Sequence, residues 1–244
     1  MNNSISRSKW LATTAILAAM ASVLFFWEMP VPLMPTFIQF DFSLLPCLIG
    51  SVALGPLSGI TIALFKDLIH LIFKGFGATG GIGDLADFFV CASIILPSSL
   101  IYKKMPNIKG LILGLSVGSL VSGFFAGLML NAIIVYPLYD KFLLPMTAII
   151  GMYQQIRPSS NGLWEVLAIF NMPYTFLKCA IISVMAVLIA KPLQGVLLKY
   201  SKPKQLPDQS SLEKQQDVSM ENNKENTAEA NNSDDENGKN VKTA

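Results

Sequence analysis

Long apolar runs, interrupted by charge at only a few places, are the feature that most limits how this chain can fold. A helix that crosses a bilayer needs about 20 largely apolar residues, and several segments between Trp10 and Leu188 approach or exceed that length. Only 14% of the residues are charged and 52% are hydrophobic, whereas soluble domains carry about 25% charged residues. The sequence therefore predicts an all-α integral membrane protein.

Six apolar segments are predicted to form transmembrane helices. The second segment is short and contains Pro46, and only Gly55 and Pro56 separate it from the third, which predicts a tight helical hairpin. The approximate boundaries of the six are residues 10–27, 43–54, 57–73, 85–102, 108–136 and 166–188.

The basic residues predict the orientation of these helices, because cytoplasmic loops carry an excess of lysine and arginine. With six spans, the basic clusters before the first helix, between the fourth and fifth, and after the sixth all fall on one side. Both termini are therefore predicted to be cytoplasmic. The residues concerned are Arg7, Lys9, Lys103, Lys104, Lys109, Lys191, Lys199, Lys202 and Lys204.

Two regions of different character divide the chain. Residues 1–202 form the predicted membrane domain, and its first helix is expected to stay uncleaved because no small-residue cleavage site ends the run at Trp27. Residues 203–244 are rich in Gln, Asn, Glu, Lys and Ser. Such a segment cannot bury enough apolar surface to order itself. We expect a disordered cytoplasmic tail.

The stretch from Phe65 to Phe89 concentrates charge between apolar runs. Charge at membrane depth is costly and tends to mark function, so the stretch is predicted to frame a polar, solute-holding site. Two simpler alternatives remain: the charges extend into the lipid headgroups, or the two helices pair through them. Its charged residues are Lys66, Asp67, His70, Lys74, Asp84 and Asp87.

The last two predicted helices carry polar residues of their own. Small residues recur every four positions from Gly110 to Ala126, and Gly123 and Gly127 lie on a second such row, a spacing that favours close helix packing. Asn131 lies deep in an apolar run and needs a partner from a neighbouring helix or a ligand. Asn171, Thr175 and Lys178 share one helical face. Lys178 is expected to face a carboxylate, a carbonyl or a cavity.

Enzymatic chemistry has little support in the sequence. No nucleophile with a neighbouring base, no set of metal ligands and no phosphate-binding GxxxxGKS loop is present. Cys47, Cys91 and Cys179 lie in apolar runs and are expected to be buried, unpaired thiols. We expect no enzymatic activity, no metal, no resident cofactor and no nucleic-acid partner.

Three segments carry a resemblance to a known family. The chain resembles the riboflavin-specific S components of energy-coupling-factor (ECF) transporters over roughly residues 10–195, through FIQFDFSLLPCLIGSVALGPLSGI, FKDLIHLIF and TGGIGDLADFFV. The resemblance implies a multi-pass protein of the bacterial cell membrane that binds riboflavin outside. It also implies association with a transmembrane coupling subunit and two ATPases that use ATP. Binding of another vitamin or solute, or stand-alone secondary transport, remain open alternatives.

The resemblance also implies roles for individual residues. The AxxxA pattern of Ala15 and Ala19 would dock the coupling subunit, and the loop of residues 30–42 would cap the flavin. Residue type adds Phe37, Phe40 and Phe42 as covers for the ring and Asp84 or Asp87 as acceptors of ribityl hydroxyls. The remaining expected contacts are Asn131, Asn171, Thr175 and Lys178. Departures from the family at Leu44, Leu45, Asp67, Asp87 and Thr175 leave the identity of the vitamin open.

Overall fold

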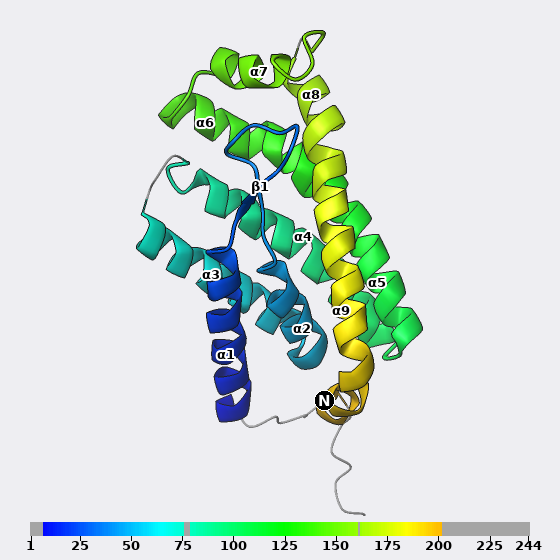
Figure 1. The fold of residues 1–244 in the computed structure, drawn as a ribbon. Helices are drawn as coiled ribbons and strands as arrows, with labels where there is room; N and C mark the ends of the chain where they lie inside the picture. Colours follow the sequence, from blue (N-terminus) through cyan, green and yellow to red (C-terminus); the bar gives the residue numbers. More distant parts are fainter. Residues whose placement is uncertain (1–6, 76–78, 161, 202–244) are drawn as a thin grey trace, which may run out of the picture. The chain divides into compact units, whose positions relative to one another are not determined.

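The computed structural model describes residues 7–75, 79–160 and 162–201, with residues 191–201 described by their backbone alone. Most of the described chain is helical (Figure 1). The tail predicted at 203–244 lies outside the described residues. The helical elements are α1 Arg7–Phe25, α2 Leu44–Leu54, α3 Pro56–Lys74, α4 Ile82–Lys104, α5 Ile108–Val121, η1 Ser122–Val135, α6 Tyr136–Phe142, α7 Met146–Gln154, α8 Leu163–Val166, η2 Leu167–Asn171 and α9 Met172–Ser201.

Five helical segments of the described chain are long and apolar enough to cross a membrane: Arg7–Phe25, Pro56–Lys74, Ile82–Lys104, Ile108–Phe142 and Leu163–Ala190. The second predicted segment is also a helix, α2, but it has only 11 residues. At 1.5 Å per residue it reaches about 16 Å, roughly half the thickness of the hydrocarbon layer. Helix α2 therefore cannot cross alone, and the count of six spans and the cytoplasmic termini stay predictions.

A short hairpin replaces the loop that was predicted between the first two segments. Strands β1 (Met29–Pro30) and β2 (Gln39–Phe40) pair antiparallel, with Met29 opposite Phe40. The prolines of this segment exclude helix, as predicted. The Tyr174 hydroxyl of α9 donates a hydrogen bond to the Gln39 carbonyl at 2.8 Å. The hairpin thus follows directly on the end of α1 and is hydrogen-bonded to α9 (Figure 1).

The small residues of α5 and η1 allow close packing, which confirms that prediction. A Cβ added at Gly114 would lie 2.7 Å from the Ser98 carbonyl oxygen of α4, closer than real contacts allow. A Cβ at Gly127 would lie 3.0 Å from the Thr175 side chain of α9. Glycines therefore bring both neighbouring helices against this segment.

Two π-helical segments interrupt the long spans. Residues 122–135 form η1 and residues 167–171 form η2, whereas ordinary helix was expected through both. The two segments pack against each other, and they carry Asn131 and Asn171. A π-helix is wider than an α-helix and frequently marks a functional site. The departure from α-helix thus coincides with polar residues inside the membrane domain.

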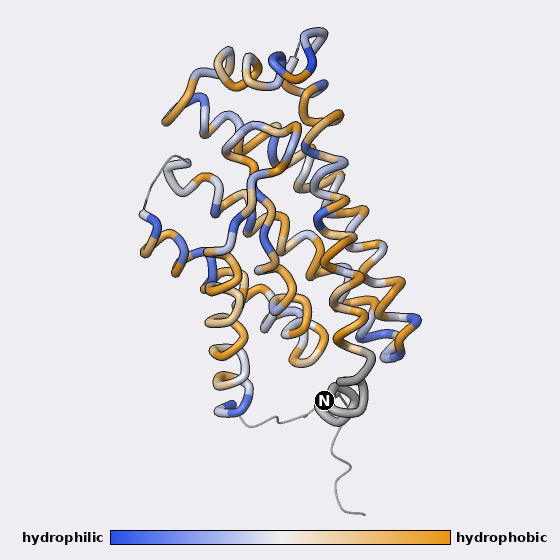
Figure 2. The backbone as a smooth tube through the Cα atoms, viewed as in Figure 1, coloured by the Kyte–Doolittle hydropathy of each residue, from blue (hydrophilic) through white to orange (hydrophobic). Residues whose placement is uncertain are grey.

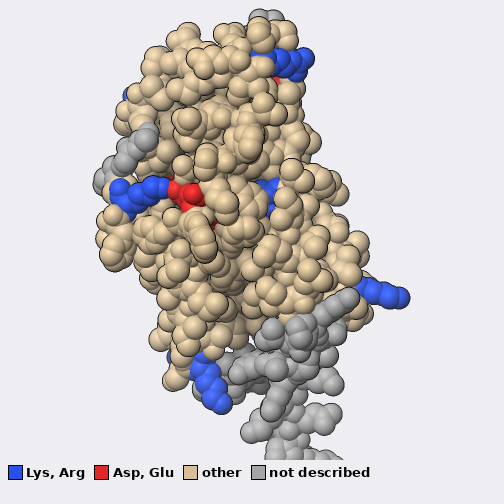
Figure 3. Space-filling view, in the orientation of Figure 1, with Lys and Arg blue, Asp and Glu red and all other residues tan. Residues whose placement is uncertain are grey.

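Two buried apolar clusters form the core of the described chain. One joins α1, α2, α3, α4, α5 and α9 around residues such as Leu48 and Ile94. The other joins α4, η1, α6, α7, α8 and η2 around residues such as Tyr136 and Leu167. Hydrophilic positions interrupt the apolar backbone at the level of the hairpin (Figure 2), and the surface drawn in Figure 3 is mostly uncharged, with charged side chains at a few separate places. The polar groups are therefore concentrated inside, beneath the hairpin.

Candidate functional site

A cavity lies beneath the hairpin, between α4, η1, α6, η2 and α9. It holds about 650 Å³ of free space, a volume that includes the open solvent at its mouth. We call it the aromatic cavity, because Phe37, Tyr136, Tyr139 and Tyr174 supply aromatic side chains to its lining.

The structure brings five of the seven predicted binding residues to this cavity. They come from α4, η1, η2 and α9, which are separated in sequence by up to about 90 positions. The convergence explains why polar side chains are tolerated in these apolar spans. The five are Asp87, Asn131, Asn171, Thr175 and Lys178.

Phe40 and Asp84 lie elsewhere. Phe40 belongs to β2, and its ring packs edge-on against Phe42 at 5.1 Å and against the first core cluster rather than lining the aromatic cavity. Phe37, which was expected beside Phe40 as a ring cover, does line the aromatic cavity, with its ring centroid 5.6 Å from that of Tyr139. Asp84 precedes Asp87 by nearly one turn of α4 and lines a neighbouring cavity.

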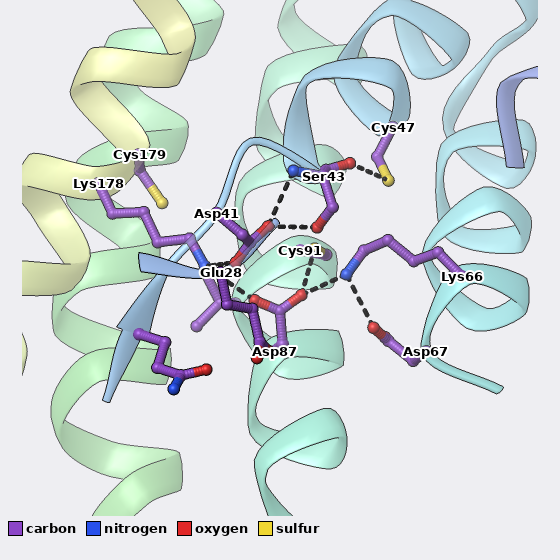
Figure 4. Close-up of polar contacts among 12 residues, drawn as sticks. Glu28, Asp41, Ser43, Cys47, Lys66, Asp67, Asp87, Cys91, Lys178 and Cys179 are labelled. Atoms are coloured by element: carbon purple, nitrogen blue, oxygen red, sulfur yellow. Dashed lines mark hydrogen bonds and ion pairs between the residues drawn. The ribbon is translucent and has the colours of Figure 1, made fainter. Parts of the chain in front are cut away.

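A buried charge network borders the floor of the aromatic cavity (Figure 4). The Lys178 ammonium donates to Asp41 Oδ2 at 2.7 Å and to Asp87 Oδ1 at 2.9 Å. The Lys66 ammonium donates to Asp87 Oδ2 at 2.5 Å and to Asp67 Oδ1 at 2.7 Å. These five residues, the charge network, join the hairpin, α3, α4 and α9. The expectation that Lys178 faces a carboxylate and a cavity is confirmed.

Asp41 was missed from the sequence. Its Oδ1 accepts hydrogen bonds from the Ser43 amide at 2.8 Å and from the Ser43 hydroxyl at 2.5 Å, which turns the chain into α2. Asp41 is only 2% exposed. Its position as a lone carboxylate in an apolar loop was the available signal, because such a charge needs a cationic partner.

The charged stripes of α3 and α4 pair with each other, as the helix-pairing alternative predicted. His70 Nδ1 lies 2.5 Å from Asp84 Oδ1, and His70 Nε2 lies 3.5 Å from Glu28 Oε1. Lys74 also pairs with Glu28. Lys66 of the same helix reaches Asp87, as described above. The charged side chains of the stretch from Phe65 to Phe89 therefore join α3 to its neighbours.

A second cavity surrounds these pairs. It holds about 740 Å³ of free space and shares Phe37, Gly83 and Asp87 with the aromatic cavity. Most of its other lining residues are polar, Glu28 and His70 among them, and we call it the polar cavity. The two cavities are thus neighbours under one hairpin, one with aromatic side chains and one with charged groups.

Three uncharged groups form a closed set of hydrogen bonds at the upper wall of the aromatic cavity. The Tyr153 hydroxyl donates to Asn171 Oδ1 at 2.7 Å, and Asn171 Nδ2 donates to the Tyr136 hydroxyl at 2.9 Å. The two hydroxyl oxygens are 2.6 Å apart. We call this set the hydroxyl–amide ring. Burial raises the pKa of the Tyr153 phenol well above its usual value, so the hydroxyl stays protonated.

Sequence reasoning missed both tyrosines of this ring. Tyr136 lies at the end of a predicted helix, where an aromatic residue at the membrane interface is ordinary. Tyr153 lies in a segment that was expected to be a loop, and the structure places it on α7. Neither residue type nor spacing distinguished these two from other tyrosines.

Asn131 and Thr175 complete the polar lining. Asn131 Nδ2 donates to the Gly127 carbonyl of its own helix at 3.2 Å, which leaves its side-chain oxygen and one N–H for another partner. Thr175 is 5% exposed and lies against Gly127. The cavity therefore offers amide and hydroxyl groups on one side and an ammonium on the other.

The remaining predicted residues take these positions. Ala15 and Ala19 lie on the exposed face of α1, beside Ile16, which is 63% exposed. Cys47, Cys91 and Cys179 are buried and free, as predicted. Among residues 7–75, 79–160 and 162–190, no three His, Cys, Asp or Glu side chains are grouped to hold a metal ion.

Comparison with known proteins gives consistent results. A family model described as the substrate-specific component of ECF transporters matches residues 9–190. The riboflavin transporter RibU of Staphylococcus aureus (strain TCH60) is 30% identical over 193 residues, which cover 79% of this chain and 94% of that protein. RibU of Streptococcus thermophilus (strain ATCC BAA-250 / LMG 18311) is 31% identical over 195 residues, covering 80% and 87%.

One further relative matches over a shorter length, and one solved structure has a similar fold. The riboflavin transporter FmnP of Bacillus subtilis (strain 168) is 31% identical over 135 residues, covering 55% of this chain and 70% of that protein. A solved structure of the S component of a bacterial ECF transporter superposes with a TM-score of 0.62 at 30% identity. The superposition covers 79% of this chain and 99% of the solved chain.

Proposed function

The chain belongs to the family of substrate-specific (S) components of ECF transporters, and we propose that it captures riboflavin at the outer face of the membrane. It is a multi-pass protein of the cell membrane and a transport subunit rather than an enzyme. In the proposal, riboflavin occupies the aromatic cavity and the hairpin closes over it. Similarity to three riboflavin transporters supports the choice of vitamin.

The composition of the aromatic cavity is the observation that carries this proposal. The isoalloxazine of riboflavin is flat, apolar on both faces and hydrogen-bonding along one edge. Aromatic walls with a few convergent polar groups suit such a ligand. Phe37, Tyr136 and Tyr139 provide the aromatic surface, and Asn131, Asn171 and Thr175 the polar groups.

Lys178 contributes to this site in spite of its two carboxylate partners. An ammonium has three N–H donors, and Asp41 and Asp87 accept two of them. The third N–H can donate to a ligand carbonyl, and the carboxylates cancel the charge that would otherwise be buried. Riboflavin is neutral, so a charge-balanced lysine suits it better than an unpaired one.

The ribityl chain of riboflavin can extend from the isoalloxazine into the neighbouring polar cavity. The polar cavity adjoins the aromatic cavity at Phe37, Gly83 and Asp87. We propose that the chain extends in this direction, with Asp87 or Asp84 accepting hydrogen bonds from its hydroxyls. Carboxylate oxygens have several lone pairs, so an oxygen already bonded to lysine or histidine can accept another donor.

Transport requires partners that this chain does not contain. It has no nucleotide-binding loop, so energy for uptake would come from two ATPase subunits that act through a transmembrane coupling subunit. The exposed face of Ala15 and Ala19 on α1 is proposed as the docking surface for the coupling subunit. Small residues let helix backbones approach closely within the membrane.

A double variant of α1 separates docking to the coupling subunit from riboflavin binding. Ala15→Trp with Ala19→Trp is expected to abolish co-purification with the coupling subunit and leave riboflavin binding unchanged. Leu188→Trp, on the exposed face of α9, is the matched control and should keep the complex. Retention of the complex by the double variant would contradict docking through this face.

Riboflavin binding itself is tested with the purified full-length protein. We expect a yellow sample whose bound molecule is identified by mass spectrometry as riboflavin, and quenching of flavin fluorescence on titration. A colourless sample that ignores riboflavin would assign the cavity to another vitamin or solute. Uptake by vesicles that lack any ATPase partner would instead indicate secondary transport.

A further inference from the structure

Tyr153 reaches the aromatic cavity without lining it. It lies on α7, outside the apolar spans, yet it is fully buried. Its hydroxyl contacts Asn171 and Tyr136, and both of these residues line the cavity. Any influence of Tyr153 on a ligand must therefore pass through the hydroxyl–amide ring.

For a given orientation of the Asn171 amide, the hydrogens of the hydroxyl–amide ring all run in one direction. Tyr153 donates its only hydroxyl hydrogen to Asn171 Oδ1, so it must accept the hydrogen of Tyr136. Tyr136 in turn accepts one hydrogen from Asn171 Nδ2. The ring closes equally well with the amide turned over. In either orientation the amide retains one N–H and one oxygen lone pair outside the ring.

We propose that Tyr153 is a positioning residue for the riboflavin site, holding Asn171 so that its free amide group meets the imide edge of the isoalloxazine. The proposal rests on the proposed function. The imide edge alternates C2=O, N3–H and C4=O, and a fixed amide is complementary to such a donor–acceptor pattern. The hydroxyl–amide ring contains no charged group, so it is suited to the neutral imide edge of the isoalloxazine. The acidic side chains of the polar cavity are suited to the ribityl hydroxyls.

Fixing Asn171 in advance also favours binding energetically. A side chain that is ordered only when the ligand arrives loses rotamer freedom at that moment. Two hydrogen bonds from within the protein hold this amide. The packing of α7 does not depend on the hydroxyl, since Ile149 on the same helix is 1% exposed and belongs to the same apolar cluster. Removal of the hydroxyl alone should therefore leave the fold in place.

The test compares two ligands on three full-length proteins. Riboflavin and 3-methylriboflavin, in which N3 carries a methyl group instead of hydrogen, are titrated by flavin fluorescence. Wild type should prefer riboflavin, and Tyr153→Phe should lose about tenfold in riboflavin affinity. The loss for 3-methylriboflavin should be much smaller, so the preference shrinks. Tyr102→Phe removes a hydroxyl from a buried ring of the other core cluster and should retain both affinities.

A purely structural role would give a different pattern. Equal losses for the two ligands, or no loss, would overturn the positioning role, as would a wild type without preference. Failure of wild type to bind riboflavin at all would overturn the proposed function instead. If Tyr153→Phe does not fold, Tyr136→Phe breaks the same hydroxyl–amide ring at its other tyrosine. The preference for riboflavin should shrink in that variant as well.

Discussion

Two polar clusters border the aromatic cavity, and they hold their elements together by different physics. The charge network ties the hairpin, α3, α4 and α9 through two lysines and three aspartates (Figure 4). The hydroxyl–amide ring ties α6, α7 and η2 through neutral groups only. Each cluster joins segments that are distant in the chain, and each has members in the wall of the same cavity.

The difference predicts how each cluster responds to change. Removing one partner of a buried ion pair leaves an uncompensated charge, which costs roughly 3–5 kcal/mol. Removing one hydroxyl from a neutral ring costs about 1 kcal/mol. We therefore expect substitutions in the charge network to affect folding first, and substitutions among the neutral groups to affect ligand affinity first.

Asp87→Asn should have the largest effect, because Asp87 accepts from both Lys66 and Lys178. We expect the free energy of unfolding to fall by roughly 3–5 kcal/mol and riboflavin binding to be lost. Chemical unfolding in detergent, followed by tryptophan fluorescence, measures the first quantity. Asp140→Asn, at an exposed site on α6, is the matched control with an expected change of about 1 kcal/mol or less. Equal stabilities of the two variants would contradict this role.

Lys178→Met should rank second, since Lys66 still balances Asp87 while Asp41 is left without a cation. We expect a loss of roughly 3 kcal/mol in the free energy of unfolding, together with weaker riboflavin binding. Adding Asp41→Asn removes the stranded charge and should restore most of the stability. Affinity should stay low in the double variant because the ligand-facing N–H is absent. Recovery of affinity together with stability would show that Lys178 acts only through charge balance.

Asn131→Ala should lower riboflavin affinity more than it lowers the stability of the protein. The side chain bonds only to the Gly127 carbonyl of its own segment within the described structure. The free energy of unfolding should therefore change by less than about 1 kcal/mol. Riboflavin affinity should fall by about tenfold or more, measured by titration beside wild type. A stability loss with unchanged affinity would remove Asn131 from the site.

Tyr174→Phe should give the smallest change, confined to the kinetics of the hairpin. The variant loses the hydrogen bond from α9 to the Gln39 carbonyl. A single neutral hydrogen bond is worth about 1 kcal/mol, so we expect riboflavin to dissociate about five times faster. Stopped-flow displacement of bound flavin measures this rate. An unchanged rate would show that the hairpin is not held closed by this contact.

The sequence predicted the parts of this molecule that depend on local pattern. Apolar length predicted the spanning helices, and four-residue spacing predicted the close packing at Gly114 and Gly127. Residues one turn apart left pairing of the charged faces of α3 and α4 as an alternative, and the structure has that pairing. Each of these inferences uses neighbours along one helix, for which spacing determines the direction of a side chain.

The missed features depend on contacts between distant segments. Asp41 acquires its role only because Lys178 folds back onto it, 137 positions later. Tyr153 acquires its role only because α7 covers the wall that carries Asn171. The sequence did not distinguish Phe37, Phe40 and Phe42 as ring covers; of the three, Phe37 lines the cavity, and Phe40 packs against the first core cluster. A local sequence pattern does not show which distant segments will contact one another.

The most direct measurement is an experimental structure of the full-length protein purified with riboflavin. We predict the isoalloxazine in the aromatic cavity, beneath Phe37, with its imide edge toward Asn131 and Asn171. The Asp41–Lys178 pair should remain intact beneath it. Riboflavin bound elsewhere, or an aromatic cavity that stays empty while the protein holds the vitamin, would contradict the proposed site.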